Sequence, residues 1–274
     1  MIKEQEVEIK NVKSALQQTL CYKQPKLQLY AEDCLDTLRR ISTGSVDLLL
    51  QDTPFGCTQN QWDIKPNFEI MWQEWERVTK ENAAMIFFGT QPFASELIVS
   101  RSKYFRYDLI WRKSHATGFL NAQKQPLRVH EHILVFYKEQ PNYNPIIIDK
   151  PKQNIRPITL KPRLSNNYGK FKEGNTRTIP IDKSYPDSVW YFDNESKTET
   201  EHPTQKPLEL IRYLIQTYSN ENDIVFDGYS GSGTTAAACL KENRQFIGSE
   251  LSKEYFEMSV KRLDEIIRQP ELFR

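Results

Sequence analysis

The chain has 274 residues with 37 Lys and Arg against 36 Asp and Glu, so its formal net charge of +1 predicts no general affinity for nucleic acid or for an anionic membrane. This length fits one large domain or a domain with an insertion, and an aromatic content of 12% argues against disorder. The sequence has no apolar run near the ~20 residues that span a bilayer, no signal peptide and only four scattered cysteines, so we expect a reduced, cytoplasmic protein without membrane contact, zinc or disulfides.

The charge is unevenly distributed along the chain. Residues 103–177 contain 15 basic and five acidic residues, and the remainder is net acidic. Such asymmetry indicates one face or lobe that binds a polyanion. The alternative is that a long, lysine-rich insertion merely keeps the chain soluble.

The first half of the chain, from Lys26 to Lys138, alternates strand and helix patterns. Val46–Gln51 is an almost continuous apolar run, which is typical of a buried parallel strand. The other strands that we expect here are Lys26–Ala31, Ala83–Gly89, Tyr107–Trp111 and His132–Tyr137, and the helices are Cys34–Ile41 and Phe68–Lys80.

The middle of the chain, residues 140–201, differs from the first half in its proline content and in the spacing of its apolar residues. Seven of the fifteen prolines lie between Pro141 and Pro186, and the apolar residues lose their regular period. We interpret this segment as a loop-rich insertion with a small fold of its own. It separates residues 26–139 from residues 202–274, and residues 1–25 form an N-terminal extension.

After the insertion, strand and helix patterns alternate again. Pro207 is suited to the start of a helix over Leu208–Tyr218. We then expect strands at Asp223–Asp227 and Gln245–Glu250 and helices at Thr234–Asn243 and Glu254–Arg268, the last burying Phe256, Val260, Leu263 and Ile267. The whole pattern predicts an α/β fold: a Rossmann-like, doubly wound and mainly parallel sheet, with ligands beyond the carboxyl ends of its strands.

A glycine-rich turn links a strand to a helix at residues 224–236. Gly228, Gly231 and Gly233 permit a sharp turn and a close approach of a ligand to the backbone. Glu250 ends the next strand, where a carboxylate can accept hydrogen bonds from both hydroxyls of a ribose. The turn has neither a dinucleotide nor a P-loop spacing, so S-adenosylmethionine, which carries a sulfonium and no phosphate, fits better than NAD. A structural turn without a ligand is the alternative.

Asp52-Thr-Pro-Phe-Gly follows the buried strand Val46–Gln51, where such a sheet places its active site. This motif resembles the Asp/Asn/Ser-Pro-Pro-Tyr/Phe loop of the amino DNA methyltransferases, although Thr53 replaces the first proline. An ordinary turn is the alternative, but three further blocks also resemble that family. They are residues 108–138, His202-Pro-Thr-Gln-Lys-Pro and Phe226-Asp-Gly-Tyr-Ser-Gly-Ser-Gly-Thr-Thr, in which Gly228 replaces a proline.

The blocks occur in the order of the beta-class amino DNA methyltransferases, with a target-recognition region between catalytic and cofactor blocks. The resemblance implies that Asp52, Thr53, Pro54 and Phe55 form the catalytic loop. Asp52 and a main-chain carbonyl would hold the target amine, and Phe55 would stack on a base flipped out of the duplex. The implied S-adenosylmethionine contacts are Asp33, Asp52, Lys206, Phe226, Asp227, Gly228, Gly231, Gly233, Thr234, Thr235 and Glu250.

The stretch Lys113–Glu131 is expected, by the same resemblance, near the mouth of the active site. It implies contacts with double-stranded DNA through Lys113, His115, Asn121, Lys124 and Arg128. The alternative is a structural hairpin, in which Glu131 holds Arg128. His130-Glu-His132 lacks the spacing of metal ligands, so we expect no metal.

Asp at position 52 favours N6 of adenine over N4 of cytosine in this family. A cytosine-N4 enzyme, an RNA or protein methyltransferase and an inactive DNA-binding relic are the alternatives. The resemblance also leaves open a homodimer and a cognate restriction endonuclease.

Overall fold

The computed structural model describes residues 20–56, 63–150, 180, 182–193 and 205–269. The chain forms two units: a larger one, up to Asn144 and from Ser188 onward, and a smaller one, Pro145–Asp187. The described part of the smaller unit contains an antiparallel strand pair, β7 (Ile148–Asp149) and β8 (Lys183–Ser184). Both ends of the predicted insertion, 140–144 and 188–193, therefore lie in the larger unit, while its residues 151–179 and 194–201 are outside the described ranges.

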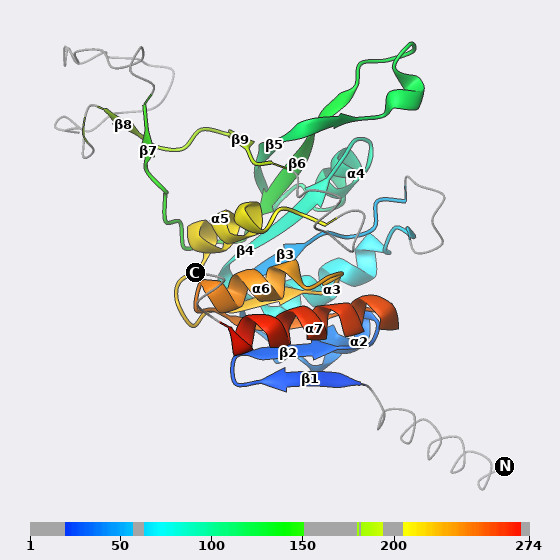
Figure 1. Cartoon of the computed structure of the whole chain (residues 1–274), viewed down its shortest axis with the longest axis vertical. Helices are drawn as coiled ribbons and strands as arrows, with labels where there is room; N and C mark the ends of the chain where they lie inside the picture. The colour runs from blue at the N-terminus through cyan, green and yellow to red at the C-terminus, as the bar shows by residue number, and fades with distance from the viewer. Residues whose placement is uncertain (1–19, 57–62, 151–179, 181, 194–204, 270–274) are drawn as a thin grey trace, which may run out of the picture. The chain divides into compact units, whose positions relative to one another are not determined.

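The larger unit is built on a nine-stranded sheet in the order β1-β2-β11-β10-β3-β4-β6-β5-β9 (Figure 1). Strands β2, β11, β10, β3 and β4 are parallel neighbours, which confirms the predicted doubly wound, mainly parallel sheet. Residues 21–24 of the predicted N-terminal extension form β1, which pairs with β2. The strands are β1 (Cys21–Gln24), β2 (Leu27–Tyr30), β3 (Val46–Gln51), β4 (Thr79–Gly89), β5 (Phe105–Thr117), β6 (Arg128–Phe136), β9 (Val189–Tyr191), β10 (Ile224–Asp227) and β11 (Gln245–Ser249).

Helices cover both faces of this sheet, because alternate side chains of its central strands point to opposite faces. On β3, Leu48 and Leu50 pack in one apolar cluster with residues of α5, α6 and α7, whereas Leu49 packs in a second cluster with α2, α3 and α4. No helix in the described ranges is long and apolar enough to cross a membrane. The helices are α2 (Cys34–Arg40), α3 (Phe68–Val78), α4 (Phe93–Ser100), α5 (Leu208–Tyr218), α6 (Thr234–Lys241) and α7 (Lys253–Arg268).

The structure departs from the predicted elements in several details. Helix α4 was not predicted, since its eight residues lack a polar face that would mark a helical period. In α7 the buried residue of the last turn is Ile266, whereas Ile267 is 41% exposed. Strands β5 and β6 also extend beyond their predicted ends, because their outer parts form an exposed hairpin without apolar alternation.

The topology brings three carboxylates to one edge of the sheet. Asp52 follows β3, Asp227 ends β10 and Glu250 follows β11, and these strands run parallel. From β10 the chain crosses through α6 to β11, and from β3 it crosses through α3, on the other face, to β4. The strand order thus reverses between β10 and β3, and such a switch point is where open α/β sheets bind ligands.

Candidate active site

The loop after β3 places Asp52 against a lysine from the other half of the chain. Asp52 Oδ2 accepts a hydrogen bond from Lys206 Nζ at 2.5 Å, and Lys206 immediately precedes Pro207 at the start of α5. The Asp52 side chain is 30% exposed, so one side of it faces solvent. The sequence predicted Lys206 beside the cofactor; the structure pairs it with Asp52, which was predicted both in the catalytic loop and at the cofactor.

Two residues that follow Asp52 in the loop, Phe55 and Gly56, are each held by a contact with another residue. The Phe55 ring lies 5.0 Å from the Phe93 ring of α4, and Asp63 Oδ1 accepts a hydrogen bond from the Gly56 N–H at 2.8 Å. Thr53 is 2% exposed, and its hydroxyl has no hydrogen-bond partner in the described part of the chain. The residue that replaces the family's proline therefore has a buried hydroxyl that no other described residue satisfies.

The ion pair continues away from the loop. Glu131 Oε2, on β6, lies 3.6 Å from Lys206 Nζ, and Glu131 Oε1 pairs with Lys113 on β5. The alternating line Asp52–Lys206–Glu131–Lys113, which we call the charge line, runs from the catalytic loop to the base of the β5–β6 hairpin. Glu131 thus holds two lysines and not Arg128, which was one of the alternatives from the sequence.

Along the charge line, burial and the neighbouring opposite charges shift the pKa values in opposite directions. Burial raises the pKa of Asp52 above its ordinary value, although the Lys206 ammonium opposes the rise. Burial has the same tendency at Glu131, but Lys206 and Lys113 together outweigh it and lower the pKa of that carboxyl. For Lys206, Asp52 and Glu131 outweigh burial and raise its pKa, so the ammonium stays charged.

Gln51 joins the two halves of the site and was not predicted. Its side chain is fully buried; its Nε2 donates to the Phe226 carbonyl at 3.0 Å and its Oε1 accepts from the Gly228 N–H at 3.2 Å. These bonds link the end of β3 to the end of β10. A glutamine that closes a buried apolar strand is the signal in the sequence, because such an amide needs partners.

The glycine-rich turn after β10 is bound to Glu250. Glu250 Oε2 accepts from the Gly231 N–H and Oε1 accepts from the Ser252 N–H, both at 2.8 Å. Gly231 and Gly233 have positive φ angles of 52° and 77°, which glycine adopts without strain. Each carboxylate oxygen keeps a lone pair for a ribose hydroxyl, so the geometry fits a nucleoside cofactor.

Asp227 lies at the centre of the sheet edge and is 4% exposed. Burial raises its pKa to about 7, although hydrogen bonds from the Thr235 side chain and the Tyr229 N–H oppose the rise. The Tyr229 N–H lies 3.0 Å from Asp227 Oδ1. A carboxyl that titrates near neutrality in a ligand site is typical of a functional position.

Gly228 takes the place of the family's proline because Cys34 fills the space above it. A Cβ added at Gly228 would lie 2.1 Å from Cys34 Sγ, closer than any real contact. The Cys34 thiol is buried at the start of α2. The departure from the family motif is therefore explained by one neighbouring side chain.

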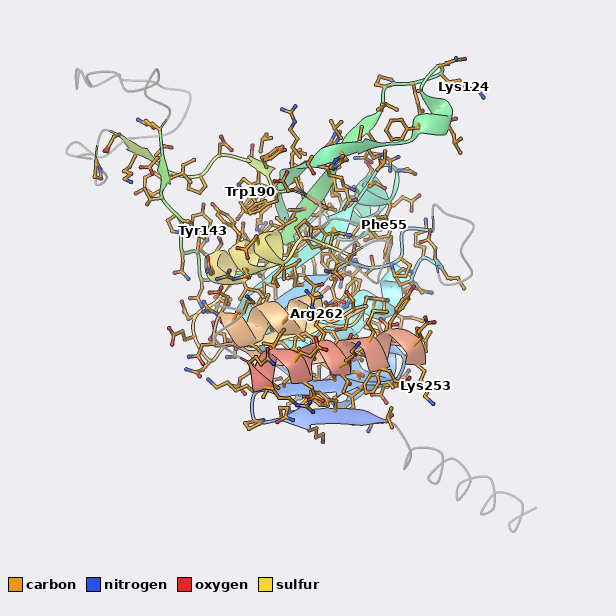
Figure 2. The ribbon with its side chains drawn as sticks, viewed as in Figure 1. Phe55, Lys124, Tyr143, Trp190, Lys253 and Arg262 are labelled. Atoms are coloured by element: carbon orange, nitrogen blue, oxygen red, sulfur yellow. The ribbon has the colours of Figure 1, made fainter. Side chains whose placement is uncertain are left out.

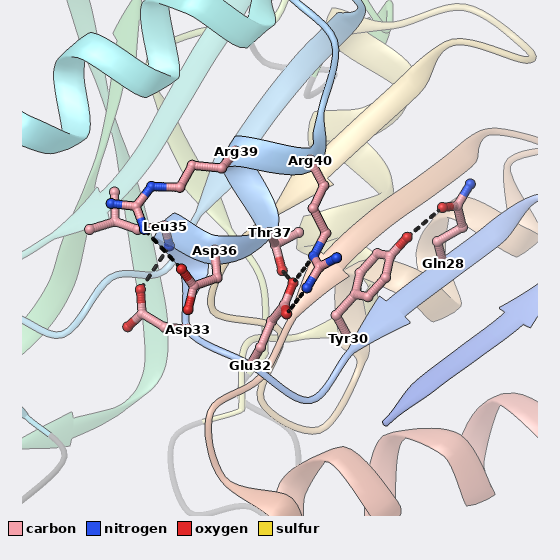
Figure 3. Close-up of polar contacts among 9 residues, drawn as sticks. All are labelled: Gln28, Tyr30, Glu32, Asp33, Leu35, Asp36, Thr37, Arg39 and Arg40. Carbon is pink, nitrogen blue, oxygen red and sulfur yellow. Dashed lines mark hydrogen bonds and ion pairs between the residues drawn. The ribbon is translucent and has the colours of Figure 1, made fainter. Parts of the chain in front are cut away.

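Three of the predicted cofactor residues have side chains that are engaged within the protein. The Phe226 ring is fully buried in the core cluster with α2–α4, and its contact with the cofactor stays a prediction. Asp33 is the N-cap of α2, where its Oδ1 accepts from the Leu35 N–H at 2.8 Å (Figure 3). Thr234 is 6% exposed and accepts from Arg262 Nη1 at 3.1 Å.

The predicted DNA contacts share the β5–β6 hairpin, which carries Lys124 near its tip (Figure 2). His115, Asn121, Lys124 and Arg128 are exposed, whereas the Lys113 ammonium pairs with Glu131 and is the least available of the five to a phosphate. The described residues contain no group of three or more His, Cys, Asp or Glu side chains that could hold a metal ion.

Comparison with known proteins identifies the family. The family model described as DNA methylase, for N6 and N4 methyltransferases, matches residues 46–261. The chain belongs to this DNA methylase family. The match contains both the catalytic loop and the glycine-rich turn in that order, so the resemblance to the beta-class amino DNA methyltransferases is confirmed.

Two curated relatives of this DNA methylase are 29% identical to it. Type II methyltransferase M.BglII of Bacillus subtilis aligns with 86% of the chain and 69% of its own length. DNA adenine methyltransferase YhdJ of Escherichia coli K12 aligns with 85% of the chain and 81% of its own length.

Solved structures support the same fold for the DNA methylase. The M1.HpyAVI–SAM complex has a TM-score of 0.58 and 24% identity, over 87% of this chain and 99% of that one. The cytosine-N4-specific PvuII DNA methyltransferase has a TM-score of 0.64 and 15% identity, over 90% and 93%. The α/β methyltransferase fold is therefore confirmed.

Proposed function

We propose that this DNA methyltransferase acts on the exocyclic N6 of adenine, with Asp52 through Phe55 as its catalytic loop. The observation that carries the proposal is the position of the Asp52 carboxylate, beside the switch point of the sheet and 30% exposed. The aspartate favours adenine, and the relative YhdJ is named a DNA adenine methyltransferase.

S-adenosylmethionine is the methyl donor, and it supplies an electrophilic methyl group on a sulfonium. Glu250 binds the ribose hydroxyls, and the turn at Gly231 and Gly233 lets the nucleoside approach the backbone. Asp227 and Asp52 place negative charge near a cationic ligand, and in a partly buried site that interaction is stronger than in water. The acidic sheet edge thus fits a sulfonium better than a phosphate.

The chain's own groups orient the target amine. Lys206 occupies Asp52 Oδ2, which leaves Oδ1 to accept one hydrogen of the amine, while a main-chain carbonyl of the loop accepts the other. These two bonds direct the nitrogen lone pair toward the methyl group, and positioning of this kind supplies much of the rate enhancement. Phe55 stacks on the flipped base, and Asp52 takes up the proton that the methylated amine releases.

Nucleoside analysis tests the base assignment. Purified protein is incubated with S-adenosylmethionine and mixed-sequence duplex DNA, and the DNA is then digested to nucleosides. We expect N6-methyladenine. N4-methylcytosine alone would refute the adenine assignment, and the absence of any methylated base would refute the catalytic proposal.

The β5–β6 hairpin is the proposed DNA contact. Residues 109–130 include four Lys and Arg and no Asp or Glu, and the hairpin extends from the same strands that carry Glu131 and Lys113. Exposed basic side chains such as Lys124 and Arg128 bind phosphates and release counterions. The homodimer and the cognate restriction endonuclease stay predictions of the family resemblance.

A further inference from the structure

The charge line isolates two ionised groups from solvent. The side chains of Lys206 and Glu131 are only 10% and 9% exposed, and Asp52 and Lys113 flank them. Opposite charges alternate along the line, so each buried charge has a partner of the other sign. Buried ions require such compensation, because an uncompensated charge in a protein interior is strongly unfavourable.

The Lys206 ammonium is confined on several sides. It lies 5.1 Å from the centre of the Phe88 ring and 5.9 Å from that of Phe55, in addition to its contact with Asp52. Its remaining charged neighbour is Glu131 Oε2, at 3.6 Å, an atom without a hydrogen-bond partner in the described chain. Among the described residues, Lys206 is therefore the charged group that the second carboxylate oxygen of Glu131 faces.

We propose that Glu131 is a positioning residue for methyl transfer: it fixes the Lys206 ammonium on Asp52 Oδ2, so that Oδ1 stays available to the target amine. This inference rests on the proposed role of Asp52. Glu131 itself contacts no reacting atom and acts through Lys206, while Lys113 compensates the charge at its other oxygen.

If the Glu131 charge acted directly on Asp52, loss of that charge would have the opposite effect on turnover to loss of a positioning residue. The groups that face Asp52 are Lys206 at the start of α5, Glu131 on β6, Lys113 on β5 and Asp227 at the end of β10. The Glu131 charge raises the pKa of Asp52, whereas Lys206 lowers it. Loss of Glu131 would favour ionised Asp52 if only its charge mattered, but it would impair turnover if Glu131 positions Lys206.

Three variants separate these accounts: E131Q, K206M and the double variant K206M/E131Q. Turnover on duplex DNA is measured across a range of pH, together with the KM for S-adenosylmethionine. For E131Q we expect kcat to fall at least about tenfold even on the alkaline plateau, with KM changed less than a few-fold. For K206M we expect the acid limb of the profile to move by about one pH unit or more to higher pH, because burial at Asp52 is then unopposed.

The double variant gives the decisive comparison. If Glu131 acts through Lys206, adding E131Q to K206M causes no further loss of kcat and moves the acid limb part of the way back. If Glu131 merely supports the fold, E131Q reduces kcat by the same factor in both backgrounds, which overturns the proposal. Wild-type kcat in E131Q, with an acid limb at lower pH, also overturns it.

A matched control and a folding check complete the design. Glu81 forms an ion pair with Lys138 at 2.8 Å, outside the charge line, and E81Q should behave as the wild type. Calorimetric binding of S-adenosylmethionine reports whether each variant is folded. If E131Q does not bind S-adenosylmethionine, the comparison of K206M with the double variant decides whether Glu131 acts through Lys206. An inactive wild-type protein would refute the proposed function, whereas an active wild type with normal E131Q turnover refutes this inference alone.

Discussion

Asp52 and Asp227 are both carboxylates at strand ends, but their environments differ. Asp52 is partly exposed and paired with Lys206, whereas Asp227 is 4% exposed and held by a backbone N–H and the Thr235 side chain. Burial, with a smaller contribution from the Asp52 and Glu250 charges, explains why the pKa of Asp227 rises to about 7. The two residues therefore lead to separate predictions.

Replacement of Asp52 should abolish turnover and spare cofactor binding. D52A removes the acceptor for the target amine, and loss of one such preorganised bond reduces kcat by about 100-fold or more. The affinity for S-adenosylmethionine, measured by calorimetry, should change less than a few-fold. Loss of binding would instead show that Asp52 acts mainly on the cofactor, and would contradict its proposed role at the target amine.

Asp227 should make the folded protein less stable as the pH rises. Its folded pKa lies above its unfolded value of about 3.8, so its contribution is most favourable when it is protonated and is lost as the pH rises from about 4 to about 7. D227N should therefore raise the free energy of unfolding at pH 8 by up to about 4 kcal/mol, with a smaller gain at pH 5. Urea unfolding at both values tests this expectation, and an equal gain at both would contradict it.

Gly228 and Cys34 should be coupled in stability. G228A places a Cβ 2.1 Å from Cys34 Sγ, and such overpacking destabilises by about 1–3 kcal/mol. The double variant G228A/C34A removes the 2.1 Å contact but keeps contacts of 3.1 Å with Gln51 Oε1 and 3.2 Å with the Cβ at position 34, so it should recover part of the loss. Urea unfolding of both single variants and the double variant measures the coupling, and additive losses would argue against the contact.

At the scale of elements, the sequence predicted most strands but not their outer parts. Val46–Gln51 was predicted to the residue, because an apolar run in a central parallel strand leaves little freedom. The exposed half of β5 carries no such pattern. The predicted strand ends also placed Asp52 and Glu250 at one edge of the sheet. The contact between Lys206 and Glu131 could not be predicted, because it depends on the directions of two side chains on distant elements, which the periodicity of the sequence does not encode.

The β5–β6 hairpin should supply much of the salt dependence of DNA binding. K124A/R128A removes two exposed cations from a segment without acidic residues, so the slope of log affinity against log salt should become shallower by about two. K253A/K261A, on α7, is the control of equal charge; Lys253 lies far from Lys124 in Figure 2. Equal slopes for both variants would argue against the hairpin as the DNA contact.

At the scale of the whole molecule, the near-zero net charge is a sum over unlike regions. The hairpin is basic, and the sheet edge with Asp52, Asp227 and Glu250 is acidic. The first suits a polyanionic substrate and the second a cationic cofactor. Whole-chain charge alone therefore says little about either ligand.

The smaller unit, Pro145–Asp187, should govern the choice of target sequence. Its replacement by a flexible linker should leave cofactor binding intact, because Asp227, Glu250 and the glycine-rich turn belong to the larger unit. Calorimetry checks the binding, and long-read sequencing of methylated DNA checks site selection. Unchanged site selection would contradict the target-recognition role of this unit.

The sheet order also makes the chain a candidate for circular permutation. Strands β11 and β10 enter between β2 and β3, and the Tyr22 hydroxyl donates to Asp264 Oδ1 at 2.6 Å, so the first and last described elements touch. Joining the two ends and opening the chain between Asn144 and Ser188 would reverse the order of the two blocks in the gene while keeping every strand pair of the larger sheet. We therefore expect the same active site to form from either gene order, because the pairs of strands that build it do not depend on which block comes first.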